Sequence, residues 1–268
     1  MQTFKEKYGP VALIAGASEG LGAAWAEALA KRGLDLVLIA RRKERLDEIT
    51  ASLVSKYKIR TWSLPCDLAT PDAAKYIADE TKNIPVSCIV YNAASSYIGP
   101  FLKNSADENE RIIAVNITTP LLLVRDLADR MIEARKGAII LMSSLAGFQG
   151  SGFLSLYASS KAFTRVLAES LWYEWKSKGI DVIACCAGAV STPNFIQSNP
   201  GKMGRLAPRP QQPEEVVEEC LKRLGKTPSF ISGKGNRIAS LFMQRIFTRK
   251  KAVTIMGNAT RKIYKVKD

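Results

Sequence analysis

The sequence places a tyrosine and a lysine four residues apart, at Tyr157 and Lys161, inside a segment of helical periodicity. Residues at positions i and i+4 share a helix face, so the ammonium can lie beside the phenol. The unperturbed pKa of a tyrosine is about 10, and a nearby cation lowers that pKa by favouring the phenolate. Such a pair can donate and accept the proton when a ketone and an alcohol interconvert.

The chain contains no histidine. This removes the Ser-His-Asp and Cys-His mechanisms and the commonest metal ligand. Acid–base chemistry must therefore come from tyrosine, lysine or a carboxylate, and we predict no metal site.

Two further polar residues stand where they can assist Tyr157. Ser144 lies thirteen residues before it, at the end of an apolar segment, and can donate a hydrogen bond to a substrate oxygen. Asn116 interrupts a long helical segment upstream. Taken alone, each is more typical of a helix cap or a loop than of a functional residue.

Short apolar runs alternate with helical stretches along the chain, which is typical of a parallel sheet covered by helices. Most of the runs are apolar throughout, as strands buried on both faces are. The predicted strands are residues 11–15, 35–40, 60–64, 86–91, 137–142, 181–186 and 229–232. The predicted helices are residues 21–31, 43–56, 71–82, 107–135, 157–178 and 213–224.

A glycine-rich turn, Gly16-Ala-Ser18-Glu-Gly20-Leu21-Gly22, joins the first strand to the first helix. Glycines there allow a tight turn and let the backbone approach a pyrophosphate at the helix N-terminus. An ordinary turn explains many such sequences, but the position between strand and helix favours a dinucleotide.

Arg41 and Arg42 follow the second strand, where an acid would bind the ribose of NAD. Guanidinium groups suit a 2′-phosphate instead, so we predict NADP(H). Glu19, in the glycine-rich turn, argues mildly the other way.

Together these motifs resemble the short-chain dehydrogenase/reductase family, in the family's order and over nearly the whole chain. The resemblance implies one Rossmann-type doubly wound domain of seven parallel strands with helices on both faces. It implies that Ser144 polarises a carbonyl, Tyr157 protonates it, Lys161 binds the ribose and tunes Tyr157, and Asn116 holds a relay water. The implied cofactor site comprises Gly16, Ser18, Gly20, Leu21, Gly22, Arg41, Arg42, Asp67, Leu68, Asn92, Ala93, Tyr157, Lys161, Gly188, Val190 and Thr192. Three residues depart from the family pattern at backbone-shaping positions: Ala15, Ala94 and Ala187.

We assign residues 1–233 to the Rossmann domain, with 189–212 as a substrate-binding loop, and 234–268 to a basic helical extension packed on the same domain. Residues 222–268 hold thirteen lysines and arginines and one acid, so they carry most of the net charge of +14. This charge is consistent with a solvated face or with attraction to an anionic surface or substrate. The mixed apolar and basic segment 238–251 is typical of an interfacial helix or of a cap on the domain or a partner subunit. No nucleic-acid motif accompanies the charge, so we expect no nucleic-acid partner.

Within the family, the opening Lys5-Glu-Lys-Tyr-Gly9, Glu19 and the stretch that begins at Leu224 resemble bacterial bile-acid hydroxysteroid dehydrogenases. A bulky apolar ketone or secondary alcohol, such as a steroid, is the predicted substrate. The predicted pocket wall comprises Tyr97, Ile98, Phe101, Phe148, Phe153, Leu154, Phe195 and Ile196. The alternatives are a 3-oxoacyl thioester reductase and a non-catalytic cofactor-binding sensor or scaffold.

The chain shows no apolar run long enough to span a membrane and no signal-peptide pattern, so we expect a cytoplasmic protein. Its five cysteines form no C-x-x-C pair and are typical of buried thiols. The resemblance implies a homodimer or homotetramer built on the helices 107–135 and 157–178. Weak contact of the basic tail with a membrane surface stays possible.

Overall fold

A computed structural model of the chain describes residues 2–198 and 208–266. All seven strands pair in parallel in one sheet of order β3-β2-β1-β4-β5-β6-β7. This confirms the predicted seven-stranded Rossmann-type fold. The strands are β1 (Val11–Ala15), β2 (Asp35–Ala40), β3 (Thr61–Pro65), β4 (Val86–Tyr91), β5 (Gly137–Ser144), β6 (Ile180–Ala187) and β7 (Ser229–Ile231).

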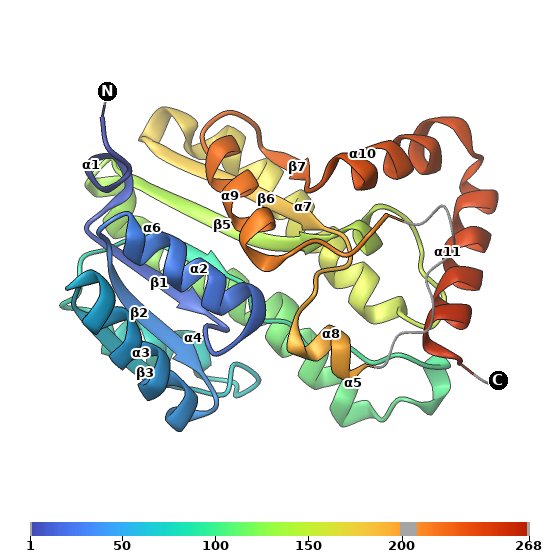
Figure 1. The fold of residues 1–268 in the computed structure, drawn as a ribbon, viewed down its shortest axis with the longest axis horizontal. Coiled ribbons are helices and arrows are strands. Elements are labelled where there is room, and N and C mark those ends of the chain that lie inside the picture. The colour runs from blue at the N-terminus through green and yellow to red at the C-terminus, as the bar shows by residue number, and fades with distance from the viewer. Residues whose placement is uncertain (1, 199–207, 267–268) are drawn as a thin grey trace.

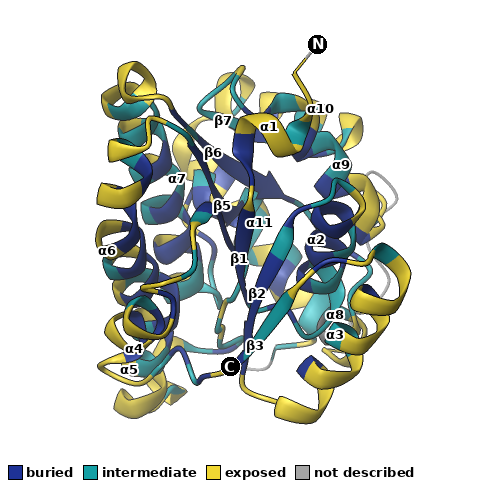
Figure 2. Ribbon diagram, turned by 90° about the vertical axis from the view of Figure 1, so that its left-hand side faces the viewer, coloured by how far each residue is buried: buried dark blue, intermediate teal, exposed yellow. Residues whose placement is uncertain are grey.

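Helices cover both faces of the sheet, and Figure 2 shows the buried strands between two exposed helical layers. One layer contains α2 (Gly20–Lys31), α3 (Lys43–Tyr57) and α9 (Pro213–Arg223). The other contains α4 (Ala73–Glu80), α5 (Ala106–Ile113), α6 (Thr119–Glu133) and α7 (Ser155–Trp175). The short helices are α1 (Phe4–Tyr8), α8 (Pro193–Gln197) and the 3₁₀ turns η1 (Phe101–Lys103), η3 (Leu145–Phe148) and η4 (Lys176–Lys178).

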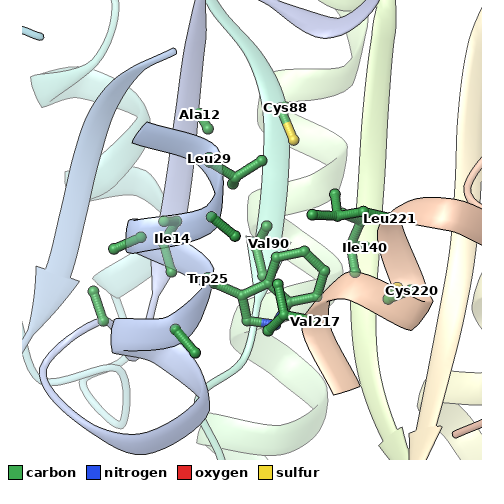
Figure 3. Packing of buried hydrophobic residues seen from close by; sticks show 14 of the residues in the cluster. Ala12, Ile14, Trp25, Leu29, Cys88, Val90, Ile140, Val217, Cys220 and Leu221 are labelled. Atoms are coloured by element: carbon green, nitrogen blue, oxygen red, sulfur yellow. The ribbon is translucent and has the colours of Figure 1, made fainter. Parts of the chain in front are cut away.

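Alternate residues of each strand supply the two cores, because successive side chains point to opposite faces. Ile14 of β1 belongs to the core under α2 and α9, whereas Leu13 belongs to the core under α4, α6 and α7. Trp25 of α2 fills the first core and lies against Val217 of α9 (Figure 3). Both faces of the strand are therefore apolar, which explains its continuous apolar sequence.

One predicted helix differs from the structure. Residues 107–135 do not form a single α-helix: α5 ends at Ile113, and a π-helical turn, η2 (Ala114–Thr118), separates it from α6. Asn116 lies within this turn.

After β7 the chain forms α10 (Lys234–Leu241), the π-helical turn η5 (Phe242–Ile246) and α11 (Arg249–Tyr264). Helix α11 runs down the right-hand edge of Figure 1, beyond the sheet. It packs on the loop after β5: the Arg249 guanidinium donates to the Phe148 carbonyl at 2.8 Å, and the Thr260 and Ser151 hydroxyls lie 3.3 Å apart.

All five cysteines are free and buried, as predicted. Across the described residues, no helix is both long and apolar enough to cross a membrane.

Candidate active site

Ser144 and Tyr157 meet at the carboxyl edge of the sheet. Ser144 is the last residue of β5, and Tyr157 lies in the first turn of α7. Ser144 lies close enough to the Tyr157 phenol to lower its pKa. The Ser144 hydroxyl also accepts from the Ala146 N–H at 3.2 Å, which fixes its direction at the start of η3.

The pKa of Tyr157 lies above its ordinary value, because burial opposes the phenolate more than the nearby Ser144 favours it. The prediction that Lys161 lowers the pKa of Tyr157 is therefore wrong. The Lys161 ammonium lies 5.6 Å from the centre of the Tyr157 ring and donates to the Met142 carbonyl at 2.8 Å. Burial lowers the pKa of Lys161 to about 8, because it disfavours the charged form.

Asn116 is buried, and its side chain joins two elements. Its amide nitrogen donates to the Ser95 carbonyl at 2.8 Å and to the Ser160 hydroxyl at 3.0 Å. Its amide oxygen accepts from the Ser95 N–H at 2.8 Å. The side chain thus ties the loop after β4 to α7, close to Tyr157 and Lys161. Turns of the π type often occur at functional sites.

The glycine-rich turn forms a cradle that side chains would fill. Gly16 has a φ of +83°, and a Cβ there would lie 2.8 Å from the backbone of Ala93. A Cβ on Gly22 would lie 1.8 Å from the Gly16 carbonyl oxygen. The Asn92 amide donates to that same oxygen at 3.0 Å and so joins β4 to the turn. The turn, with Ser18, Gly20 and Leu21, leads directly into α2.

Arg41 and Arg42 are exposed beyond the end of β2, next to the cradle. Arg42 forms a 2.8 Å ion pair with Glu19 and donates to the Ser18 hydroxyl at 3.5 Å. Glu19 is therefore paired with Arg42, one of the two arginines predicted to bind the 2′-phosphate.

Asp67 follows β3 and is held by Arg111 of α5 through two hydrogen bonds of 3.0 and 3.1 Å. Burial raises the pKa of Asp67, but Arg111 and the Ala69 N–H outweigh burial and lower it. Leu68 is buried, and its carbonyl accepts from the Thr119 hydroxyl at 2.8 Å.

Three predicted cofactor residues follow β6. Val190 pairs with Gln211, and the Thr192 hydroxyl accepts from the Phe195 N–H at 3.2 Å at the start of α8. A Cβ on Gly188 would lie 2.6 Å from the Asn236 amide of α10. Residues 199–207 of the predicted loop 189–212 lie outside the described residues.

Part of the predicted pocket wall lines a small hollow between the loop after β4, α5 and the start of α7. Tyr97, Phe101 and Phe153 line it together with Leu156, the residue directly before Tyr157. Phe148 instead packs under the Arg165 guanidinium, and Ile196 is exposed on α8. Ile98, Leu154 and Phe195 are partly buried.

The family model for short chain dehydrogenases matches residues 10–202. The chain belongs to the short-chain dehydrogenase family. It is 33% identical to a 7beta-hydroxysteroid dehydrogenase of Clostridium sardiniense, over 87% of this chain and 89% of that protein. A solved structure from a study of 7beta-hydroxysteroid dehydrogenase stereoselectivity superposes with a TM-score of 0.90 at 28% identity, over 96% and 99% of the two chains. A short-chain dehydrogenase from Sphingobium yanoikuyae in complex with NADPH has a TM-score of 0.75 at 30% identity, over 83% and 87%.

Short-chain dehydrogenases are oxidoreductases of alcohols and ketones that bind a nicotinamide cofactor. Gly16 and Gly22 let the backbone pack more closely than a Cβ would permit, and this tight turn leads into the N-terminus of α2, which fits the pyrophosphate of such a cofactor.

Two residues at this short-chain dehydrogenase site escaped the sequence analysis. Tyr264, near the end of α11, lies close enough to Tyr157 to raise the pKa of Tyr157 further, and it lies near Ser198. Arg111 pairs with Asp67 across the sheet edge. No motif marks either residue, because each reaches the site through tertiary packing.

Proposed function

We propose that this short-chain dehydrogenase uses NADP(H) to interconvert a ketone and a secondary alcohol on a bulky apolar substrate such as a hydroxysteroid. The observation that carries the proposal is the proximity of Ser144 and Tyr157, whose pKa Ser144 lowers, at the same carboxyl edge of the sheet as the glycine-rich turn. It supports a site where one hydroxyl polarises a carbonyl oxygen while a phenol protonates it.

The cofactor supplies the hydride when it is bound. Gly16, Gly20 and Gly22 would hold its pyrophosphate, Arg41 and Arg42 its 2′-phosphate and Asp67 its adenine. Lys161 would exchange its bond to the Met142 carbonyl for the ribose hydroxyls and then tune Tyr157. Thr192 would hold the nicotinamide amide, with Ser18, Leu21, Leu68, Asn92, Ala93, Gly188 and Val190 lining the remaining surface.

The Tyr157 phenol holds the transferred proton in the reduction direction. Its raised pKa supports this assignment, because a protonated phenol is the form that donates to the nascent alkoxide. Asn116 would order a relay water through the backbone of its π-helical turn, since its side chain is occupied by Ser95 and Ser160.

The NADP preference is supported by Arg41 and Arg42 after β2, where no carboxylate stands, and by the NADPH-bound relative. A bulky apolar substrate is supported by the hydroxysteroid dehydrogenases among the relatives.

A substrate panel tests this proposal. NADPH oxidation would be followed with oxo bile acids, ketosteroids, 3-oxoacyl thioesters and quinones, and repeated with NADH. We expect turnover with NADPH that is fastest on an oxo steroid. Faster turnover of a 3-oxoacyl thioester would select the alternative substrate class. Tight NADPH binding without turnover of any ketone would favour the sensor or scaffold.

We also propose a homodimer or homotetramer that uses α6 and α7. Val166 and Tyr173 are exposed seven residues apart on one side of α7, and Leu121 of α6 is exposed as well. Static light scattering on the wild type and on Tyr173→Asp tests this, and an unchanged monomer mass in both would contradict it.

A further inference from the structure

Helix α10 and the turn η5 bury a polar side and expose an apolar one. The side buried against the domain carries Asn236 and Ser240, which are 4% and 6% exposed. The outer side carries Ile238, Leu241, Phe242 and Ile246, which are 50%, 57%, 48% and 64% exposed.

The four apolar residues form one stripe. Leu241, Phe242 and Ile246 follow Ile238 by three, four and eight residues, and these spacings return to the same side of a helix. By contrast, α5 buries its Ile112 and exposes a charged side. The inward side of α10 is satisfied by polar contacts: the Asn236 amide donates to the Ser232 carbonyl at 2.8 Å and to the Gln211 side chain at 3.3 Å. A grouped apolar stripe on an exposed helix marks an interaction surface.

Basic residues surround this stripe. Lys234 and Arg245 are exposed and fall on the same side of the helix as the stripe, and Lys250 follows at the start of α11. Within the described part of the chain, none of these three cations forms an ion pair. The only acid in residues 222–268 is Asp268, and the Glu219 carboxylate of α9, which contacts α10, is already paired with Arg237.

This charge distribution distinguishes between two partners. A twofold contact centred on this stripe would place the stripe on itself, and would bring the unpaired cations of both copies together. An anionic bilayer offers the complementary charge for the basic residues and an acyl boundary for the apolar stripe.

We propose that α10, η5 and the start of α11 bind the surface of an anionic lipid bilayer. Ile238, Leu241, Phe242 and Ile246 enter the boundary between headgroups and acyl chains. Lys234, Arg245 and Lys250 contact the headgroup phosphates. The binding is peripheral, and it is independent of the proposed reaction because none of these residues belongs to the candidate active site.

Vesicle flotation tests the proposal on the full-length protein. The wild type would be mixed with phosphatidylcholine vesicles and with vesicles of phosphatidylcholine and phosphatidylglycerol in equal parts. We expect binding to the mixed vesicles that weakens at high ionic strength, and at most trace binding to phosphatidylcholine alone.

Two variants separate the apolar and the electrostatic contributions. Leu241→Ser with Phe242→Ser removes half of the stripe and should reduce partitioning roughly tenfold or more. Arg245→Glu with Lys250→Glu should reduce it by a similar factor, roughly tenfold. Tyr76→Ser and Lys178→Glu replace an exposed aromatic residue on α4 and an exposed lysine after α7, and should leave partitioning unchanged.

Circular dichroism and NADPH affinity would show that each variant stays folded. Light scattering would be run in parallel, because loss of a dimer in Leu241→Ser/Phe242→Ser without any vesicle binding by the wild type would overturn the proposal in favour of a second copy. Equal binding to neutral and anionic vesicles would also overturn it.

Discussion

The cofactor side and the substrate side of the sheet edge are built in different ways. The glycine cradle is held by neighbours on adjacent strands: the Gly16 and Ala17 N–H groups donate to the Ile39 carbonyl at 2.8 and 3.0 Å, and Asn92 closes the turn from β4. The surroundings of Tyr157 depend instead on α11, which begins more than ninety residues later and brings Tyr264 to the site. The first side is therefore part of the sheet, whereas the second is added to it from the C-terminal extension.

This difference assigns separate tasks to the two sides. Changes at the cradle and the arginines should alter cofactor binding alone, and a change at Tyr264 of α11 should alter the KM for the ketone alone. Ser144, Tyr157 and Lys161 lie between them, so changes there should alter the reaction.

The largest effect should come from the shared centre. Ser144→Ala removes the hydroxyl that we assign to the substrate carbonyl, and kcat should fall by about 10²–10³-fold. Steady-state kinetics with the best ketone measures this, and NADPH affinity, measured by nicotinamide fluorescence, should not change. A normal kcat in this variant would remove Ser144 from the proposed chemistry.

Lys161, in the same centre, should destabilise the folded protein at neutral pH. Its pKa of about 8 lies below the ordinary 10.5, so burying the charged form opposes folding at neutral pH. The unfolded chain binds more protons than the folded one between these two values, so this penalty disappears as the pH rises from about 8 to 10.5. At neutral pH we expect Lys161→Met to have a higher free energy of unfolding than the wild type. This difference should shrink by about 3 kcal/mol as the pH rises over that range.

Urea unfolding of both proteins without cofactor measures this difference. Comparing the two proteins cancels the other groups that titrate in the same range, among them the buried cysteines. An advantage that does not change with pH would show that Lys161 ionises normally in the folded protein.

On the cofactor side, Arg42→Ala should weaken NADPH binding by roughly tenfold, because a charge-assisted bond to the 2′-phosphate is lost. NADH binding should not change. Glu19→Gln should act in the opposite direction, since it releases Arg42 from its ion pair, and should tighten NADPH binding by roughly two- to fivefold. Equal effects on NADH and NADPH in either variant would contradict the assignment of the 2′-phosphate.

On the substrate side, Tyr264→Phe should raise the KM for the ketone by roughly two- to tenfold, because one neutral hydrogen-bonding group is lost. Its hydroxyl lies near both Tyr157 and Ser198, whereas the glycine cradle lies on other elements. NADPH affinity should stay the same. If the affinity for NADPH changed and the KM did not, α11 would belong to the cofactor side.

The same division explains what the sequence could predict. The bounds of β1, β2 and β4 agree with the prediction because strands buried on both faces appear as continuous apolar runs. The glycine-rich turn could also be predicted from local sequence, since the spacing of its glycines indicates the backbone conformation of the turn. Even α1 had a local signal, the capping box of Thr3 and Glu6, which the prediction did not use.

What could not be predicted depends on contacts between distant segments. The π-helical turn at Asn116 is stabilised by Ser95 and Ser160, and neither contact follows from the periodicity of residues 107–135. Lys161 stands at the expected spacing from Tyr157, yet the Met142 carbonyl competes for its ammonium and burial lowers its pKa. The pairing of Arg111 with Asp67 and the position of Tyr264 likewise need the folded chain.

A single-turnover experiment with Tyr157→Phe tests the central claim most directly. The protein would be saturated with NADPH, mixed with the best ketone and followed through the loss of nicotinamide absorbance. We expect tight NADPH binding in both proteins and a hydride-transfer rate roughly 10²–10⁴-fold lower in the variant. An unchanged rate would show that the proton comes from another group and would contradict the account of this site.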